Sequence, residues 1–232
     1  MIRCQRSIER RYIRTESQEI WMTFDRSNAS HPFRRGFRAL GLLNEVRLLP
    51  GTEFTLPSDE GHESLTYVRE GGLVIRHRPR QDEFLGPGSC KRAATRRFRV
   101  SGASGESPFQ GAHIFVTSMA SYRQDREPNN DHKYYPFSDR HGTLRLIASA
   151  ESNPESLRLQ QDARVYSSIL DRGHHVVYEL SPGRGAWLHV VAGKVRLVDH
   201  CLEAGDGASL DEESAVSFTA LESSEILLFD LA

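Results

Sequence analysis

Cysteine is scarce in this sequence, and the three residues that occur are far apart. Cys4, Cys90 and Cys201 form no CxxC pair, so they indicate neither a disulfide framework nor a zinc site. Such usage is typical of a reducing compartment, and we expect a cytoplasmic protein. No apolar run approaches the ~18 residues of a membrane span, and no apolar stretch follows the basic N-terminal segment. We therefore expect neither a membrane anchor nor a secretory signal.

An excess of charge of either sign is also missing. The 30 Lys and Arg residues are balanced by 31 Asp and Glu residues, so no overall field favours nucleic acid or an anionic membrane. The basic run at residues 91–99 is expected to be solvated. No GxGxxG motif lies between a strand and a helix. We therefore expect a small-molecule substrate, no nucleic acid and no membrane as partners, in a monomer or homodimer.

What the sequence does contain is a series of short apolar runs bounded by glycine, proline, aspartate and asparagine. β-Branched residues are frequent in these runs, which favours strands. The runs cover residues 40–49, 65–75, 112–117, 165–170, 187–197 and 226–231. Closed barrels and sandwiches solve the edge problem for many short strands, and an eight-stranded barrel encloses room for one small ligand. The sequence therefore predicts an all-β protein with a small-molecule cavity.

One part of this pattern occurs twice. Residues 67–75 and 189–197 both read as a hairpin that turns at glycine, and each copy is followed by a second turn, at residues 86–89 and 204–207. Residues 122–139 are polar and rich in turn formers, as a linker or long surface connection would be. The echo predicts two domains, which we place at residues 1–139 and 140–232.

Four sequence segments, taken in their order along the chain, make the prediction of a two-domain all-β protein more specific. They are GFRAL at residues 36–40, LTYVREG at 65–71, WLHVVAG at 187–193 and EILLFDL at 225–231. Together they resemble the pirin family, and the resemblance runs from residue 1 to the C-terminus with small gaps. It implies a bicupin, two jelly-roll β-barrels in one chain. The C-terminal half has no His-x-His, so its cupin domain is expected to support the N-terminal one.

Pirin-like proteins typically carry a His-Pro-His before the LTYV-like strand and a His-x-Glu after a Pro-Gly turn. Those four side chains bind one metal, usually iron. Here they fall on Leu56, Ser58, Ser101 and Ala103. Leucine and alanine have no lone pair to offer, and a serine hydroxyl is a poor ligand. The resemblance therefore predicts a cupin with no metal and no cofactor.

A shift of a few residues in this alignment gives a different prediction. It would bring Asp59, His62, Glu63 or Glu106 near the former ligand positions and rebuild a carboxylate-rich metal site. Successive residues of a strand point to opposite faces, so His62 and Glu63 cannot both face the cavity if both lie within the strand.

Three residues at the start of the LTYV strand are candidate catalytic groups. Glu63 is either a general base or a hydrogen-bonded structural acid. His62 is either an acid or base, because imidazole exchanges a proton near neutral pH, or an exposed loop residue. Tyr67 shares a strand face with Glu63 and is either a hydrogen-bond donor to a ligand or a core tyrosine.

Four further residues are candidate substrate contacts. Ser58 and Ser101 stand at former ligand positions and are expected to line the cavity. Arg38 is either an anion clamp in the cavity wall or a solvent-facing strand residue. Glu106 lies in a glycine- and serine-rich loop, where a carboxylate is more often solvated than turned to a cavity.

Three functions follow from these alternatives. Loss of the metal ligands favours a metal-free enzyme that uses acid–base chemistry, of isomerase, cyclase or lyase type, as found in biosynthetic pathways. The family resemblance implies a second function, metal-dependent quercetinase-like dioxygenase activity. The third is a non-catalytic binding or regulatory pirin, which a large exposed apolar patch would favour.

Overall fold

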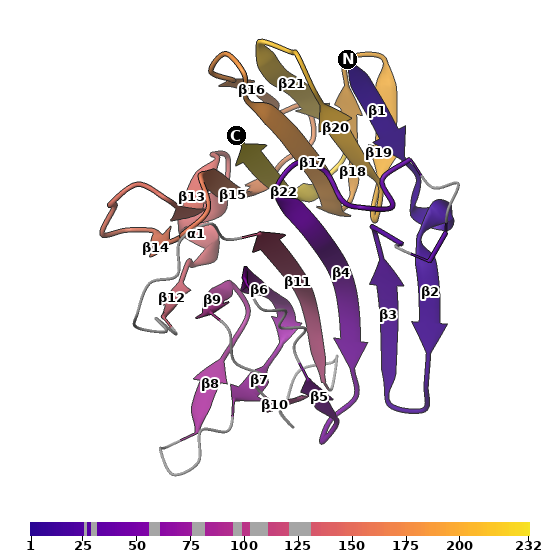
Figure 1. The fold of residues 1–232 in the computed structure, drawn as a ribbon, viewed down its shortest axis with the longest axis vertical. Coiled ribbons are helices and arrows are strands. Elements are labelled where there is room, and N and C mark those ends of the chain that lie inside the picture. Colours follow the sequence, from indigo (N-terminus) through magenta and orange to yellow (C-terminus); the bar gives the residue numbers. More distant parts are fainter. Residues whose placement is uncertain are drawn as a thin grey trace. The chain divides into compact units, whose positions relative to one another are not determined.

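The computed structural model is built almost entirely of strands (Figure 1). The structure describes residues 1–25, 27–28, 32–55, 61–75, 82–94, 99–102, 111–120 and 131–232, with the backbone alone for residues 94 and 99–102. In these ranges the helices are one 3₁₀ turn, η1 (Ser7–Glu9), and one α-helical turn, α1 (Phe137–Arg140). Within the same ranges, no helix is long and apolar enough to cross a membrane. The all-β prediction is confirmed.

The chain divides into two compact units. The N-terminal unit comprises residues 11–36 and 40–135, and the C-terminal unit comprises residues 1–10, 37–39 and 136–232. The first strand, β1 (Ile2–Gln5), pairs with β20 (Gly207–Leu210) and so belongs to the C-terminal unit. The place of residues 1–10 in the C-terminal unit is not predictable from the sequence, because a four-residue strand carries no pattern that identifies its pairing partner.

The N-terminal unit contains two sheets. The larger has the order β12-β9-β6-β11-β4-β3-β2 and the smaller has the order β5-β10-β7-β8. The strands of the larger sheet are β2 (Arg11–Arg14), β3 (Gln18–Met22), β4 (Leu40–Leu48), β6 (His62–Gly71), β9 (Ser89–Ala94), β11 (Ala112–Ala120) and β12 (His132–Tyr134). Those of the smaller are β5 (Glu53–Thr55), β7 (Leu73–Ile75), β8 (Glu83–Leu85) and β10 (Arg99–Gly102).

The C-terminal unit repeats this plan. Its larger sheet has the order β1-β20-β17-β22-β15-β13-β14, and its smaller sheet has the order β16-β21-β18-β19. The remaining strands of the larger sheet are β13 (Arg145–Ser149), β14 (Leu157–Arg158), β15 (Ala163–Leu170), β17 (Gly185–Ala192) and β22 (Ser224–Leu231). Those of the smaller are β16 (His175–Glu179), β18 (Lys194–Leu197), β19 (His200–Glu203) and β21 (Ala215–Ala220).

The two copies of the segment predicted as a hairpin occupy equivalent places in the two units. The first forms β6 and β7, and the second forms β17 and β18. Neither copy is a hairpin, because each pair of strands is divided between the larger and the smaller sheet and the chain passes from one sheet to the other at the glycine. Gly71 and Gly193 stand at the two turns with φ of 70° and 77°. A Cβ at either position would collide with a backbone carbonyl oxygen, so both turns require glycine. The internal echo is therefore confirmed as a structural repeat.

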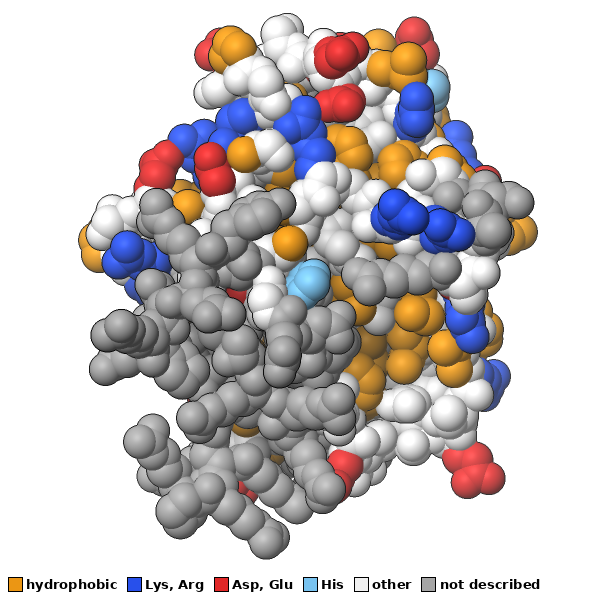
Figure 2. Space-filling view, in the orientation of Figure 1, with side chains coloured by type: hydrophobic (Ala, Val, Ile, Leu, Met, Phe, Trp, Pro, Cys, Tyr) orange, Lys and Arg blue, Asp and Glu red, His pale blue; other side chains and the backbone are white. Residues whose placement is uncertain are grey.

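Each unit has its own apolar core between its two sheets. In the N-terminal unit the core is built from alternate residues of β4, β6 and β11, packed against Leu73, Ile75 and Leu85 of the smaller sheet. In the C-terminal unit the equivalent strands β15, β17 and β22 supply the core together with β16, β18 and β21. Figure 2 shows hydrophobic side chains also at the surface, over β3 and β4.

Candidate functional site

Alternation along three neighbouring strands sets the geometry of the N-terminal unit. Strand β11 lies between β4 and β6, and Ile114 is opposite Val46 on one side and Val68 on the other. All three of these residues belong to the apolar core between the sheets. Every second residue on these strands therefore points inward with them, and we call this the inward face.

Polar side chains occupy the inward face at one end of these strands. The inward positions of β6 read His62, Ser64, Thr66 and Val68 in chain order, so the polar residues come first. Ser118 of β11 lies opposite Ser64, and Asn44 of β4 lies beside Val116, the neighbour of Thr66. We call these five residues the polar strip: Asn44, His62, Ser64, Thr66 and Ser118.

Three members of the polar strip are buried residues whose side chains make no hydrogen bond to any described residue. Asn44 is 7% exposed, Thr66 2% and Ser118 6%. Within the part of the chain that the structure describes, none of these three side chains makes a hydrogen bond, and the Oδ1 atom of Asn44 is fully enclosed. Burying an amide or hydroxyl without a partner is unfavourable, so such groups are rare in a folded protein.

Glu63 lies on the opposite face from the polar strip. Its carboxylate accepts a hydrogen bond of 3.0 Å from Nε of Arg92, and the two side chains are 1% and 2% exposed. Tyr67 shares this face and is 3% exposed. Strand β6 begins at His62, so His62 and Glu63 both lie within the strand and point to opposite faces. The ion pair supports the structural interpretation of Glu63.

A second buried polar pair lies on that opposite face. His113 Nε2 is 2.9 Å from Oε1 of Glu45, and His113 Nδ1 is 3.3 Å from Nη1 of Arg69. His113 is 2% exposed. This pair is not predictable from the sequence, because Glu45 and His113 belong to different apolar runs and only the register of β4 with β11 brings them together.

The start of the basic run is buried rather than solvated. Lys91 and Arg92 of β9 are each 2% exposed, which corrects the expectation for these two residues. Lys91 lies opposite Thr66 in the register and points inward, and its Nζ is 2.7 Å from Oε2 of Glu83 in β8. Glu83 also pairs with His132 of β12. The cluster ties the edge of the smaller sheet to the edge of the larger.

Arg38 does not lie in the wall of the N-terminal barrel, and this placement is corrected. It precedes β4 in a turn with φ of 51°, and it belongs to the C-terminal unit. Its guanidinium donates to Oδ1 of Asp211 at 2.6 Å and to the carbonyl oxygen of Gly183 at 2.8 Å. Arg38 therefore serves as a structural contact within that unit.

Several predicted positions lie outside the described residues. These are Leu56, Ser58, Ala103 and Glu106. Ser101 is in β10, where it lies opposite Glu53 of β5 and Val74 of β7. The structure describes only its backbone.

The C-terminal unit places a different set of groups at the equivalent end of its inward face. Asp230 of β22 lies opposite Arg164 of β15, as Ser118 lies opposite Leu42 in the N-terminal unit. Tyr178 donates a hydrogen bond of 2.6 Å to Asp230, and Arg184 donates one of 2.5 Å. Burial and the hydrogen bond to Asp230 raise the pKa of Tyr178. These groups satisfy one another and need no ligand.

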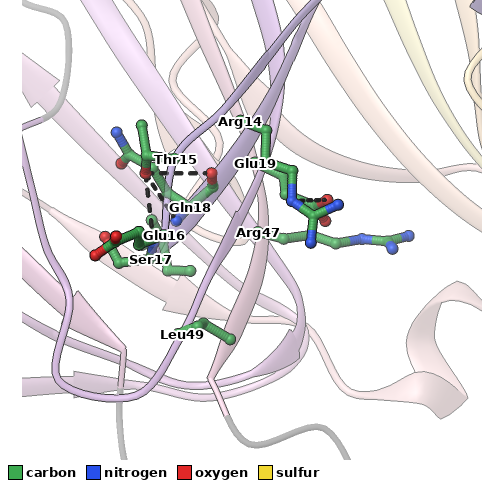
Figure 3. A pocket seen from close by; sticks show the side chains of 9 residues that line it. Arg14, Thr15, Glu16, Ser17, Gln18, Glu19, Arg47 and Leu49 are labelled. Atoms are coloured by element: carbon green, nitrogen blue, oxygen red, sulfur yellow. Dashed lines mark hydrogen bonds and ion pairs between the residues drawn. The ribbon is translucent and has the colours of Figure 1, made fainter.

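A small surface pocket of about 150 Å³ lies at the turn between β2 and β3 (Figure 3). Thr15 organises this turn by accepting hydrogen bonds from the backbone N–H of Ser17 and Gln18. Arg14 and Glu19 face each other at 3.8 Å. The pocket is smaller than the roughly 300 Å³ of a ligand site, and its polar groups serve the hairpin itself.

Metal binding is not supported by the described inward residues. In the described ranges, no group of three or more His, Cys, Asp and Glu side chains is placed to hold a metal ion. The polar strip offers an amide, three hydroxyls and one imidazole. Iron and nickel sites are built mainly from several imidazole, thiolate or carboxylate ligands, so this set does not fit them.

Comparison with known proteins agrees with this architecture. A family model described as the quercetinase C-terminal cupin domain matches residues 146–231. A quercetin 2,3-dioxygenase from Escherichia coli is 26% identical over 239 residues, covering 100% of this chain and 99% of that protein. A pirin-like protein from Caulobacter vibrioides is 27% identical over 206 residues, covering 87% of both.

Solved structures show the same architecture. The crystal structure of YhhW from Escherichia coli superposes with a TM-score of 0.87 at 26% identity and covers 100% of this chain and 98% of that one. A structure of bacterial pirin YhhW in complex with nickel(II) superposes with a TM-score of 0.85 at 23% identity. Two repeated β-units with this topology define the class of bicupins. Within that class, the chain is similar to pirins, in its C-terminal part by the family model and along its length by the pirin-like relatives and structures.

Proposed function

We propose that this chain is a metal-independent pirin-like cupin that binds a small organic molecule at the inward face of its N-terminal unit and performs acid–base chemistry on it. The observation that carries the proposal is the polar strip, an uncharged set of amide and hydroxyl groups with one imidazole. Such a lining orients a ligand without offering a metal its preferred donors. The reaction types that fit are isomerisation, cyclisation and elimination.

His62 is the proton-transferring group in this proposal. It is the one imidazole of the polar strip, and imidazole is the side chain that most often serves as a general acid or base. Glu63, its neighbour, is held by Arg92 on the opposite face. Asn44, Ser64, Thr66 and Ser118 would orient the ligand through hydrogen bonds. The C-terminal unit is proposed to be structural, because the Asp230 cluster fills the equivalent position with groups that satisfy one another.

Nitrobenzisoxazole is a suitable probe for an accessible base. The base removes the ring C–H proton, the N–O bond breaks, and the electron pair is left on the phenolate oxygen of a coloured nitrile. The proposal predicts that the wild-type chain accelerates this reaction and that His62→Gln lowers the rate at least about tenfold. Glu63→Gln, compared at a temperature where it is folded, retains the rate. Equal rates for His62→Gln and wild type would remove His62 from its assigned role.

A second candidate, dioxygenase activity, is favoured by the relative named quercetin 2,3-dioxygenase, which matches along the full length of this chain. It is distinguished by measuring dioxygen uptake with quercetin, with and without added Fe(II) or Ni(II). The proposal predicts no metal-dependent uptake by the wild-type chain. Metal-stimulated uptake that matches quercetin loss and is stopped by a chelator would establish the dioxygenase instead.

A further inference from the structure

Three unpartnered groups of the polar strip specify what the N-terminal unit binds. We propose that Asn44, Thr66 and Ser118 select an uncharged ligand with a hydrogen-bond donor beside an acceptor, as in a lactam or an α-hydroxyketone. The inference rests on the proposed function only in placing the ligand at the inward face. It does not depend on the reaction, nor on the role of His62.

The carboxamide of Asn44 decides which hydrogen-bonding groups the ligand must offer. Asn44 is 7% exposed, and its Oδ1 atom is enclosed and accepts no hydrogen bond from any described residue. A carboxamide presents one acceptor and two donors in a plane. A ligand edge that offers a donor next to an acceptor pairs with both atoms of the carboxamide at once, so removal of its donor leaves Oδ1 unpaired.

The two hydroxyls extend this requirement to neighbouring strands. Thr66 lies across Val116 from Asn44, and Ser118 is two residues further along β11 on the same face. Hydroxyls donate and accept, so they accommodate further oxygen atoms of the ligand. None of the three groups carries charge, and Lys91, the nearby inward cation, is paired with Glu83 at 2.7 Å. A neutral ligand therefore suits these contacts better than a carboxylate or phosphate.

Polar residues kept for a ligand lower the stability of the free protein, and the chain provides a matched control. Thr66 and Thr117 are both 2% exposed and lie on adjacent strands. Thr117 donates a hydrogen bond of 3.2 Å to the carbonyl oxygen of Leu65, whereas Thr66 makes none to any described residue. Replacing a threonine by valine removes the hydroxyl and keeps the shape, so the two substitutions differ in the bond alone.

The first test therefore needs no ligand. Thr66→Val and Asn44→Leu are expected to raise the midpoint of thermal unfolding by about 2–4 °C each, whereas Thr117→Val lowers it by a similar amount. Equal decreases for Thr66→Val and Thr117→Val would show that the Thr66 hydroxyl is satisfied in the free protein. That result would overturn the assignment of Thr66, and a decrease for Asn44→Leu would do the same for Asn44.

The second test uses two pairs of probes in ligand-observed NMR titrations. Pyridone is compared with N-methylpyridone, and hydroxychromone with its methyl ether, because methylation removes only the donor. We expect the donor-bearing member of at least one pair to bind about tenfold more tightly, and Asn44→Leu to abolish that preference. The pair that shows it distinguishes lactam from hydroxyketone.

Ser168→Ala serves as the control for Ser118→Ala. Ser168 is also buried without a hydrogen-bond partner in the described chain, but it lies in the core of the C-terminal unit at 0% exposure. Ser118→Ala is expected to weaken probe binding and Ser168→Ala to leave it unchanged. Equal binding of methylated and unmethylated probes, or no binding by any of them, would overturn the ligand class. Neither result bears on the metal-independence of the chain, which is measured separately.

Discussion

Side-chain direction along β6 decides which of its residues can meet a ligand. From the sequence, His62 and Glu63 were expected to point to opposite faces if both lay within the strand, because alternation follows from backbone geometry alone. It left open which of the two faces the core. That depends on the partner strands, since β11 and β4 place Val116 and Val46 on the side of His62. Arg92 forms the ion pair with Glu63, although the basic run to which it belongs was expected from the sequence to be exposed to solvent.

Substitution of Glu63 is expected to affect stability more than chemistry. Glu63→Gln removes the carboxylate that Arg92 contacts in a site almost closed to water, which costs about 3 kcal/mol of unfolding free energy. His62 is half-buried, and His62→Gln is expected to change that free energy by no more than about 0.5 kcal/mol. Urea denaturation of both variants measures the difference. A larger loss for His62→Gln would exchange the roles of the two residues.

Tyr178 makes the C-terminal unit sensitive to alkaline pH. Its pKa is raised in the folded protein by burial and by the hydrogen bond to Asp230, so the fold favours the protonated phenol. This contribution is fully present below the ordinary tyrosine pKa of about 10 and is lost as pH rises above it. The free energy of unfolding should therefore fall above about pH 10.

Tyr178→Phe isolates that contribution. It is expected to lower the free energy of unfolding by about 1–2 kcal/mol near pH 8, through loss of the bond to Asp230, and to reduce the further fall at alkaline pH. Denaturant unfolding across this range measures both effects. Tyr134→Phe is the control, because Tyr134 is 63% exposed. Parallel pH profiles for wild type and Tyr178→Phe would contradict the account.

Among the elements, strands were easier to predict than their partners. Apolar runs bounded by turn formers located β4, β11, β15 and β22, because a buried strand needs such a run. The pairing of β1 with β20 and of β12 with β9 was not predictable, since edge strands carry little apolar sequence. Of the polar strip, His62 was a candidate from the sequence and the other members were missed for a related reason. Asn44 and Thr66 are polar residues inside apolar runs, Ser64 and Ser118 lie next to such runs, and only strand register brings them together.

The passage of the chain from β6 in the larger sheet to β7 in the smaller sheet depends on Gly71. In Gly71→Ala the new methyl group would collide with the carbonyl oxygen of Gly111, in addition to the strain of a positive φ. Gly51 has a similar φ of 77° and open space around it. We expect Gly71→Ala to cost more than about 3 kcal/mol and Gly51→Ala about 1 kcal/mol in denaturant unfolding. Equal costs would show that the collision is relieved by movement of the loop.

For the whole molecule, the two units share one topology and differ in what fills the same end of their inward faces. The C-terminal unit places the Asp230 cluster there, in which the carboxylate is held by Tyr178 and Arg184. The N-terminal unit places there the amide of Asn44 and the hydroxyls of Thr66 and Ser118, which make no hydrogen bond to any described residue. This contrast supports the proposal that the N-terminal unit binds the ligand and that the C-terminal unit is structural. It also makes metal-independence the central property to measure.

The most direct measurement is the metal content of the chain, determined by elemental mass spectrometry after growth with added iron and nickel and purification without chelators. A variant carrying Leu56→His, Ser58→His, Ser101→His and Ala103→Glu introduces the ligand set that the resemblance to pirins implies at these positions, and it serves as the positive control. The account predicts no bound metal in the wild-type chain and about one metal per chain in the variant. About one tightly held metal in the wild-type chain would contradict the account and favour the dioxygenase.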